Sequence, residues 1–324
     1  ALHLQHIRHD ARADRLSALR HALLPSVGEI GHDHAHAVGA RPPERIQIEQ
    51  QLHQVVVYRH RAGLNDKNIL IDDTMSVVKD PSIDIIIELI GGTKIAKTVV
   101  ETALRYKKHV VTANKALLAH FGADLFALAR ENEVSLLFES SVGAGIPIIR
   151  SLAYSYSADR INTIRGILNG TTNYILTNME EQGRDFQDVL KEAQEHGYAE
   201  PDPTFDVEGF DTAHKLCILA SMAFGQDIRS DSVYVNGITQ VQKDDLVYAR
   251  ELGYIVKLLG IAKLNESGKA EVRVHPTLIP RTSTLASVRG VYNAIEIEGE
   301  PIGAQMLYGR GAGWGSTASG VLGD

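Results

Sequence analysis

Short apolar segments alternate with amphipathic ones through much of this chain, and this rhythm restricts the fold more than any other feature. The clearest apolar segment is IDIIIELI at 83–90, which is bounded by Pro81 and by Gly91 and Gly92. A near-continuous apolar run of this length is typical of a strand buried on both faces of a parallel sheet. Further strands are expected at 55–58 (VVVY), 109–112 and 134–138.

Segments with helical spacing separate these strands, at 73–78, 95–106 and 116–130. In the second of them, Ile95, Val99 and Ala103 recur on one helical face. Strands that alternate with helices imply right-handed crossovers. The sequence therefore predicts an α/β protein with a Rossmann-type, doubly wound parallel sheet.

A second domain of the α+β class is predicted after residue 145. Strands are expected at 160–168, 271–279 and 291–297, and amphipathic helices at 185–197 and 209–226. We assign 55–145 to nucleotide binding and 146–302 to substrate binding and dimerisation. The segment 303–324 is expected to return to the first domain, and to lack a C-terminal helix because it is rich in Gly, Ser and Thr.

Composition excludes several classes of protein. The net charge of −7 argues against a nucleic-acid partner, since proteins that bind nucleic acids are usually basic. No apolar run approaches the roughly 20 residues of a membrane-spanning helix, and the N-terminus lacks the apolar core of a secretion signal. We therefore expect a cytoplasmic protein without membrane contact. The single cysteine, Cys217, excludes a disulfide scaffold and is expected in the core.

The densest group of unusual residues lies at 193–215, AQEHGYAEPDPTFDVEGFDTAHK. Five carboxylates fall within it, those of Glu200, Asp202, Asp206, Glu208 and Asp211. The prolines at 201 and 203 predict an extended or turned segment, after which Gly209 begins a helix. On that helix Asp211 and Lys215 share a face at i, i+4. Such carboxylates could hold a substrate ammonium group while the lysine supplies a proton.

Two interpretations of Asp211 and Lys215 stay open at this point. Most pairs with this spacing are solvated surface pairs worth a few tenths of a kcal/mol. The same helix also carries an apolar face with Leu216, Leu219 and Ala223. A charge on a core-facing helix is costly to bury, so its presence there would indicate a function.

The spacing of the 193–215 cluster resembles the signature of the homoserine dehydrogenases, A-x3-G-aromatic-A-x2-D-P-x2-D-V-x-G-x-D-x3-K. Other landmarks of that family follow in the expected order, namely GGT at 91–93, TANK at 112–115, ESSVGAGIPI at 139–148, GILNGTTNYIL at 166–176 and GRGAG at 309–313. The resemblance covers about residues 55–324. It implies a homodimer that pairs through the sheet of its second domain.

The resemblance implies reversible NAD(P)H-dependent reduction of aspartate 4-semialdehyde to homoserine, on the route to threonine, isoleucine and methionine. It implies that Lys215 donates the proton, that Lys115 lies near the reacting carbon, and that Glu200 and Asp211 bind the substrate. A lysine beside the aldehyde suits this chemistry, because the oxygen gains negative charge during the reduction.

Cofactor contacts are implied for Thr93, Lys115, Gly197 and Gly313. Thr93 follows a buried strand, where open parallel sheets bind ligands, but it could equally cap the next helix. Glycine-rich tails such as the one around Gly313 are often only flexible. Arg59 and Arg61 follow the strand at 55–58 and suit a 2′-phosphate, which favours NADP over NAD.

The segment ESSVGAGIPI resembles the monovalent cation loop of the family. The resemblance implies that Glu139 and the backbone carbonyls of Val142, Ala144 and Ile146 hold a sodium ion in a structural site, consistent with the oxygen ligands of hard cations. The alternative is a plain glycine-rich turn between domains, with Glu139 at the end of a strand.

Residues 1–54 stand apart from the rest of the chain and show no resemblance to the family. Nine of the 14 His lie in residues 1–60, and residues 1–61 contain eight Arg but no Lys. The family's G-x-G-x-x-G loop for the pyrophosphate is not found there. The segment is thus a reading-frame artefact, a divergent replacement, or a sign of a truncated domain. The last alternative predicts a catalytically inactive homologue.

Overall fold

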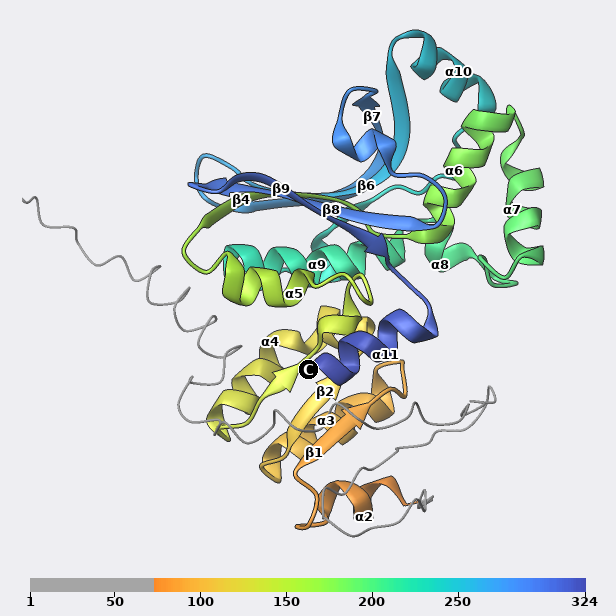
Figure 1. Ribbon diagram of the computed structural model, residues 1–324. Helices are drawn as coiled ribbons and strands as arrows, with labels where there is room; N and C mark the ends of the chain where they lie inside the picture. The colour runs from red at the N-terminus through yellow and green to blue at the C-terminus, as the bar shows by residue number, and fades with distance from the viewer. Residues whose placement is uncertain (1–72) are drawn as a thin grey trace, which may run out of the picture.

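A computed structural model describes residues 73–324. The N-terminal segment, the strand expected at 55–58, and Arg59 and Arg61 lie outside these residues. The described part contains two sheets, one parallel and one mixed, stacked as two layers with helices between them (Figure 1).

The first sheet consists of three parallel strands in the order β1-β2-β3, with bounds Ile85–Glu88, His109–Thr112 and Leu136–Leu137. Its helices are α2 (Thr74–Lys79), α3 (Lys94–Arg105) and α4 (Lys115–Glu131). Ile85 pairs with His109, and Val110 pairs with Leu136. The predicted alternation of strand and helix is confirmed, and with it the Rossmann-type part of the fold.

Local chemistry explains where these helices begin. The Asp73 carboxylate accepts hydrogen bonds from the backbone N–H groups of Met75 and Ser76, which caps α2. The Asn114 side chain accepts from Leu117 N at 3.0 Å and caps α4. Lys115 is therefore the first residue of a helix that follows directly on β2.

The second sheet has six strands in the order β5-β7-β6-β4-β8-β9. Their bounds are Tyr234–Val235 for β5, Ala270–Pro280 for β7, Tyr254–Leu264 for β6, Arg160–Ile167 for β4, Tyr292–Glu300 for β8 and Gly303–Arg310 for β9. All neighbours are antiparallel except β5 and β7. The expected α+β second domain is confirmed by this mixed sheet.

Helices of the second layer are α6 (Gly170–Gln182), α7 (Phe186–Glu195), α8 (Thr204–Val207), α9 (Phe210–Phe224) and α10 (Lys243–Glu251). A connecting segment with η1 (Glu139–Ser141), α5 (Ile148–Arg150) and η2 (Ser151–Ser155) links the two layers. Helix α9 lies between the sheets and packs against β4, β6 and β7 on one side and α4 on the other.

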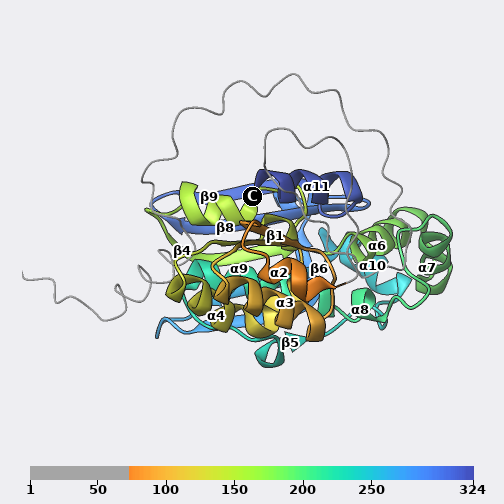
Figure 2. The same cartoon turned by 90° about the horizontal axis from the view of Figure 1, so that it is seen from below.

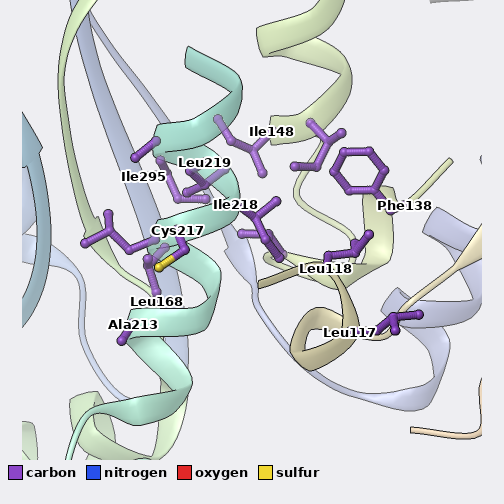
Figure 3. Packing of buried hydrophobic residues seen from close by; sticks show 14 of the residues in the cluster. Leu117, Leu118, Phe138, Ile148, Leu168, Ala213, Cys217, Ile218, Leu219 and Ile295 are labelled. Atoms are coloured by element: carbon purple, nitrogen blue, oxygen red, sulfur yellow. The ribbon is translucent and has the colours of Figure 1, made fainter. Parts of the chain in front are cut away.

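The main core is built around α9. Figure 3 shows Cys217, Ile218 and Leu219 of this helix among apolar side chains that include Leu118 from α4 and Ile295 from β8. Cys217 is buried, as expected. Side chains alternate between the two faces of the sheet along each strand. Those that point away from α9, among them Leu259 and Ala294, form a second cluster on the other face.

The C-terminal segment departs from expectation. Residues Gly303–Arg310 form β9, the edge strand of the second sheet, and Trp314–Gly323 form α11. The expectation of no C-terminal helix was wrong, because packing against the first layer stabilises a segment with poor helix propensity. Figure 2 shows α11 on the side of the first sheet opposite α3 and α4.

Between residues 73 and 324, no helix is both long and apolar enough to cross a membrane.

Candidate active site

Asp211 and Lys215 form a buried ion pair on α9. Lys215 Nζ lies 2.7 Å from Asp211 Oδ2, and the two residues are only 8% and 3% exposed. Gly209 precedes the helix with φ of +88°, a left-handed conformation that glycine adopts without strain. The interpretation as a solvated surface pair is thus excluded, because both charges lie inside the molecule.

A second lysine reaches the same carboxylate from the first layer. Lys115 Nζ lies 2.9 Å from Asp211 Oδ1. Because Lys115 begins α4 directly after β2, it lies at the carboxyl end of the parallel sheet, where such sheets bind ligands. The structure therefore brings together Lys115, Asp211 and Lys215, three residues to which the family resemblance assigns a part in the reaction or in substrate binding.

The chain after β4 completes this site, although no role was expected for it from the sequence. Lys215 Nζ donates to the carbonyl oxygen of Leu168 at 2.6 Å. Asn169 Nδ2 donates to Asp206 Oδ1 at 2.8 Å and to Asp211 Oδ2 at 2.9 Å. Two of the five clustered carboxylates, Asp206 and Asp211, are thereby joined by one amide.

The two neighbouring carboxylates have opposite pKa shifts. Burial alone would raise the pKa of Asp211, but Lys215 and Lys115 outweigh burial and hold that pKa well below its usual range. Burial and the negative charge of Asp211 raise the pKa of Asp206, against a lowering contribution from Asn169. Asp211 is the permanent anion of the site.

The other three carboxylates do not join this group. Glu200 is exposed, and its backbone carbonyl accepts from Gln194 Nε2 at 3.2 Å. Asp202 is exposed and accepts from Thr204 N, and Glu208 accepts from Thr239 Oγ1. Of the two expected substrate-binding residues, only Asp211 lies beside the lysines.

The loop after β1 is open and glycine-rich. Gly91 and Gly92 have φ of +76° and +65°, and a Cβ on either would meet no atom within 4 Å. Thr93 precedes α3, but its side chain makes no capping hydrogen bond. Thr93 is therefore the N-cap residue of α3 by position, but its hydroxyl does not cap the helix.

A buried hydrogen-bond network at the ends of β1 and β2 holds this loop and was not predicted from the sequence. Glu88 accepts from Thr112 Oγ1 at 2.6 Å and from the backbone N–H of Ile90 at 2.8 Å. Asn114 Nδ2 donates to the Gly92 carbonyl at 2.8 Å. The sequence does contain a signal for this network, because Glu88 is an acidic residue at the end of the otherwise apolar strand β1.

The two glycines expected at the cofactor have unusual backbones. Gly197 follows α7 with φ of +72°, and Gly313 precedes α11 with φ of +112°. Both are exposed. A Cβ at position 197 would meet no atom within 4 Å, so only the backbone conformation requires glycine there.

The segment from Glu139 to Ile146 is buried apart from Gly145. The Glu139 carboxylate accepts from the backbone N–H groups of Ile149 and Arg150, each at 2.9 Å. Burial raises the pKa of Glu139 more than these bonds and Arg150 lower it. Within residues 73–324, no donor is hydrogen-bonded to the carbonyls of Val142 and Ala144. The same part of the chain contains no group of three or more His, Cys, Asp or Glu side chains suited to a metal.

A short row of rings flanks the lysine pair. His214 of α9 lies 5.1 Å from His120 of α4 and 5.2 Å from Phe205, measured between ring centroids. Burial, and to a smaller extent His120, lower the pKa of His214 to about 4. The ring is therefore neutral at pH 7 and serves as a contact between the layers.

The site can thus act as a proton donor beside a fixed anion. A lysine ammonium group has three N–H donors. Lys215 uses one for Leu168 and one for Asp211, which leaves a third for a substrate oxygen. Such a group stabilises and then protonates an oxygen that becomes negative during a reaction.

Comparisons with known proteins agree with this chemistry. Residues 147–324 match the family model described as homoserine dehydrogenase, and residues 27–139 match the one described as the NAD binding domain of homoserine dehydrogenase. The second match begins within the segment 1–54, so the expectation that this segment has no resemblance to the family is wrong for residues 27–54. The homoserine dehydrogenase of Pseudomonas aeruginosa is 52% identical over 252 residues, which are 78% of this chain and 58% of that protein. The one from Corynebacterium glutamicum is 45% identical over 301 residues, or 91% of this chain and 66% of the relative.

Solved structures give the same result. A homoserine dehydrogenase from Thiobacillus denitrificans has a TM-score of 0.77 at 49% identity, and the match covers 78% of this chain and 58% of that one. A hyperthermophilic archaeal homoserine dehydrogenase in complex with NADPH has a TM-score of 0.69 at 29% identity, with 81% and 76% covered. The chain therefore spans a little under three fifths of the length of several of these relatives.

Proposed function

Because the chain belongs to the homoserine dehydrogenase family, we propose that it catalyses the reversible NAD(P)H-dependent reduction of aspartate 4-semialdehyde to homoserine, toward threonine, methionine and isoleucine. One observation carries this proposal. Lys215 and Lys115, from different layers, meet on the buried carboxylate of Asp211. Buried charges of this kind are costly to fold, so their presence here indicates a function.

Lys215 is the proton donor in this mechanism. Bound NAD(P)H supplies the hydride. The aldehyde oxygen of the substrate becomes negative as its carbon is reduced, and the free N–H of Lys215 stabilises that charge and then transfers its proton to the oxygen. The Leu168 carbonyl and Asp211 keep the ammonium group in place during this transfer. In the reverse direction, Lys215 accepts the hydroxyl proton of homoserine.

Substrate binding uses the anion of the site. Asp211 is ionised at any physiological pH and can bind the ammonium group of the substrate, in partial exchange for its contact with Lys115. Glu200 lies on the exposed loop before α8 and can approach the same group when the substrate is bound. Lys115 would then lie near the reacting carbon.

The described residues fit a dinucleotide. Gly91 and Gly92 leave open space over the end of β1, and the Thr93 side chain is not used as a helix cap. Lys115, Gly197 and Gly313 would complete the contacts, with Lys115 as the cation nearest the reacting end. Arg59 and Arg61 favour NADP over NAD by their charge alone.

The test is oxidation of NADPH by the purified chain with aspartate 4-semialdehyde. We expect consumption that depends on the aldehyde and saturates with it. A catalytically inactive homologue is the competing hypothesis, and a fluorescence titration separates the two, because an inactive homologue without a cofactor site would not bind NADPH. Absence of both turnover and NADPH binding would contradict the proposed function.

A monovalent cation, with sodium as the first choice, is proposed for the segment from Glu139 to Ile146. The carbonyls of Val142 and Ala144, which accept no bond from residues 73–324, are suitable ligands, together with the oxygens of Glu139 and Ile146. Its role would be structural. We expect the melting temperature to rise with NaCl and not with choline chloride at equal ionic strength, and equal effects of both salts would argue against the site.

A homodimer is proposed to form through the second sheet. The face opposite α9 carries Tyr292 and Tyr308, whose rings stack at 5.1 Å, and Tyr308 is half exposed. An exposed aromatic patch on a sheet face is typical of an interface. Light scattering at micromolar concentration should give twice the chain mass, whereas a monomer at all concentrations would disprove this.

A further inference from the structure

Asn169 lies between the two carboxylates that face each other in the site. It follows β4, precedes α6, and is only 5% exposed. It belongs to the GILNGTTNYIL segment, to which the proposed mechanism gives only the backbone carbonyl of Leu168. Its side chain bonds two acidic residues from two other helices, α8 and α9.

The two ends of this side chain have separate tasks. Asn169 Oδ1 accepts from Thr172 N at 2.8 Å and so caps α6. Asn169 Nδ2 donates to Asp206 and to Asp211. An amide nitrogen carries two N–H groups and can satisfy both carboxylates at once, which a hydroxyl or a carboxylate cannot.

This arrangement fixes the direction of the Asp211 carboxylate. Its Oδ2 receives Asn169 and Lys215, so its Oδ1 is left facing Lys115 at 2.9 Å. The adjacent Leu168 carbonyl holds Lys215 itself. The two residues that follow β4, Leu168 and Asn169, thus orient Lys215 and Asp211.

The amide also separates two like charges. Without a shared donor, the carboxylates of Asp206 and Asp211 would repel each other inside the protein. Asp211 could then turn away from Lys115, and Lys215 would lose the fixed partner that aims its remaining N–H.

We propose that Asn169 is a positioning residue of the active site, whose amide fixes the Asp211 carboxylate between Lys215 and Lys115. This inference rests on the proposed function. It predicts that the nitrogen of Asn169 governs turnover, while its oxygen governs only the start of α6.

Two substitutions separate these tasks. Asn169→Ser keeps a capping oxygen but loses the amide donor, so we expect it to melt within a few degrees of the parent chain. Asn169→Asp also keeps the capping oxygen, but it adds a buried carboxylate beside Asp206 and Asp211, so we expect it to melt at a lower temperature than Asn169→Ser. NADPH affinity should stay within about twofold, while kcat falls about tenfold or more. Asn178→Asp makes the same chemical change on the outer part of α6 and is the control, with parental kcat expected.

The pH profile provides a readout that a merely structural role would not move. In Asn169→Asp a third carboxylate lies beside Asp206, Asp211 and Lys215, which disfavours the ionised acids and favours the ammonium group. The pH optimum of kcat/KM should therefore move upward by about one unit. Parental kcat with an unshifted profile in either Asn169 variant would overturn the inference.

A crystal structure of the Asn169→Ser variant makes the test independent of turnover. If the parent chain does not reduce the aldehyde, the proposed function fails, but the positioning role is still decided by the Asp211 carboxylate. Its rotation away from Lys115 or Lys215 would support the role. An unchanged carboxylate in that structure would refute it.

Discussion

Lys115 Nζ lies 2.9 Å from Asp211 Oδ1, and this contact joins the two layers of the protein at their chemical site. Lys115 begins α4, which packs on the parallel sheet, while Asp211 belongs to α9, which packs on the mixed sheet. The site is therefore complete only when α4 and α9 are in contact. Changes at either residue should affect both catalysis and the stability of the layered structure, but in different proportions.

Lys215→Ala should abolish turnover while leaving NADPH binding intact. Loss of a general acid lowers a rate by about 10²- to 10⁴-fold. The proposed cofactor contacts, at Thr93, Lys115, Gly197 and Gly313, do not include Lys215, so the Kd for NADPH should not change. Single-turnover kinetics and fluorescence titration measure the two effects separately.

Lys243→Ala is the matched control for that experiment. Lys243, the first residue of α10, forms an exposed ion pair at 3.3 Å with Asp185, which precedes α7. Its kcat should equal that of the parent. If Lys215→Ala retained most of its kcat, its role as proton donor would be wrong.

Asp211→Asn should destabilise the protein strongly. The substitution leaves Lys215 buried without its anion, and breaking a buried ion pair in this way costs about 3–5 kcal/mol. Lys115→Ala removes a partner that is 35% exposed, so its effect should be only about 1 kcal/mol. Urea unfolding measures both, and equal losses in the two variants would contradict the burial argument.

The sequence predicts those parts of the fold that depend on local pattern. Strands buried on both faces give continuous apolar runs, and the prediction at 109–112 coincides with β2, His109–Thr112. Amphipathic spacing likewise predicts a helix at 95–106, and α3 spans Lys94–Arg105. The pairing of Asp211 with Lys215 follows from helical spacing in the same way.

Contacts between distant segments could not be predicted from pattern. Nothing local indicates that Asn169 reaches Asp206 and Asp211, because the fold alone brings β4 beside α9. The helix α11 was missed for a related reason, since its glycines have low helix propensity and one of them, Gly320, is required by close packing instead. The family resemblance placed Glu200 at the substrate, but the residue is exposed in the structure. It lies on a loop, and local sequence pattern does not predict the position of a loop.

His214 should make the protein less stable in mild acid. Its pKa is lowered from 6.5 to about 4 in the folded protein, first by burial, then by His120, with Lys115 adding to this and Asp211 opposing it. Between pH 4 and pH 6.5, the unfolded chain therefore binds more protons at this histidine than the folded protein does. The contribution of the neutral His214 ring to the free energy of unfolding is complete above pH 6.5. It is lost as the pH falls toward 4, at no more than about 1.4 kcal/mol per pH unit.

Urea unfolding at several pH values, on His214→Phe and on the parent, measures this effect. Phenylalanine keeps the ring contacts with His120 and Phe205 but does not titrate, so the variant should lose less stability between pH 6.5 and 4. His196→Phe, at an exposed ring, is the control and should behave as the parent. Equal slopes in the His214 variant and the parent would show that other groups cause the acid sensitivity.

Gly320→Ala should loosen α11 from the first layer. A Cβ at this position would lie 2.9 Å from the Ala144 carbonyl and would also collide with the Ser140 hydroxyl, which donates to Thr317 O at 2.7 Å. Overpacking of this kind costs about 1–3 kcal/mol. On the same helix, Gly315 has open space around its missing Cβ, so Gly315→Ala should be neutral or stabilising by up to about 1 kcal/mol.

Thermal unfolding of the two variants compares the same chemical change in one helix. Because alanine raises helix propensity at both positions, a loss confined to Gly320→Ala can come only from the contact with Ser140 and Ala144, and equal stability of the two variants would mean that this contact does not hold α11 in place.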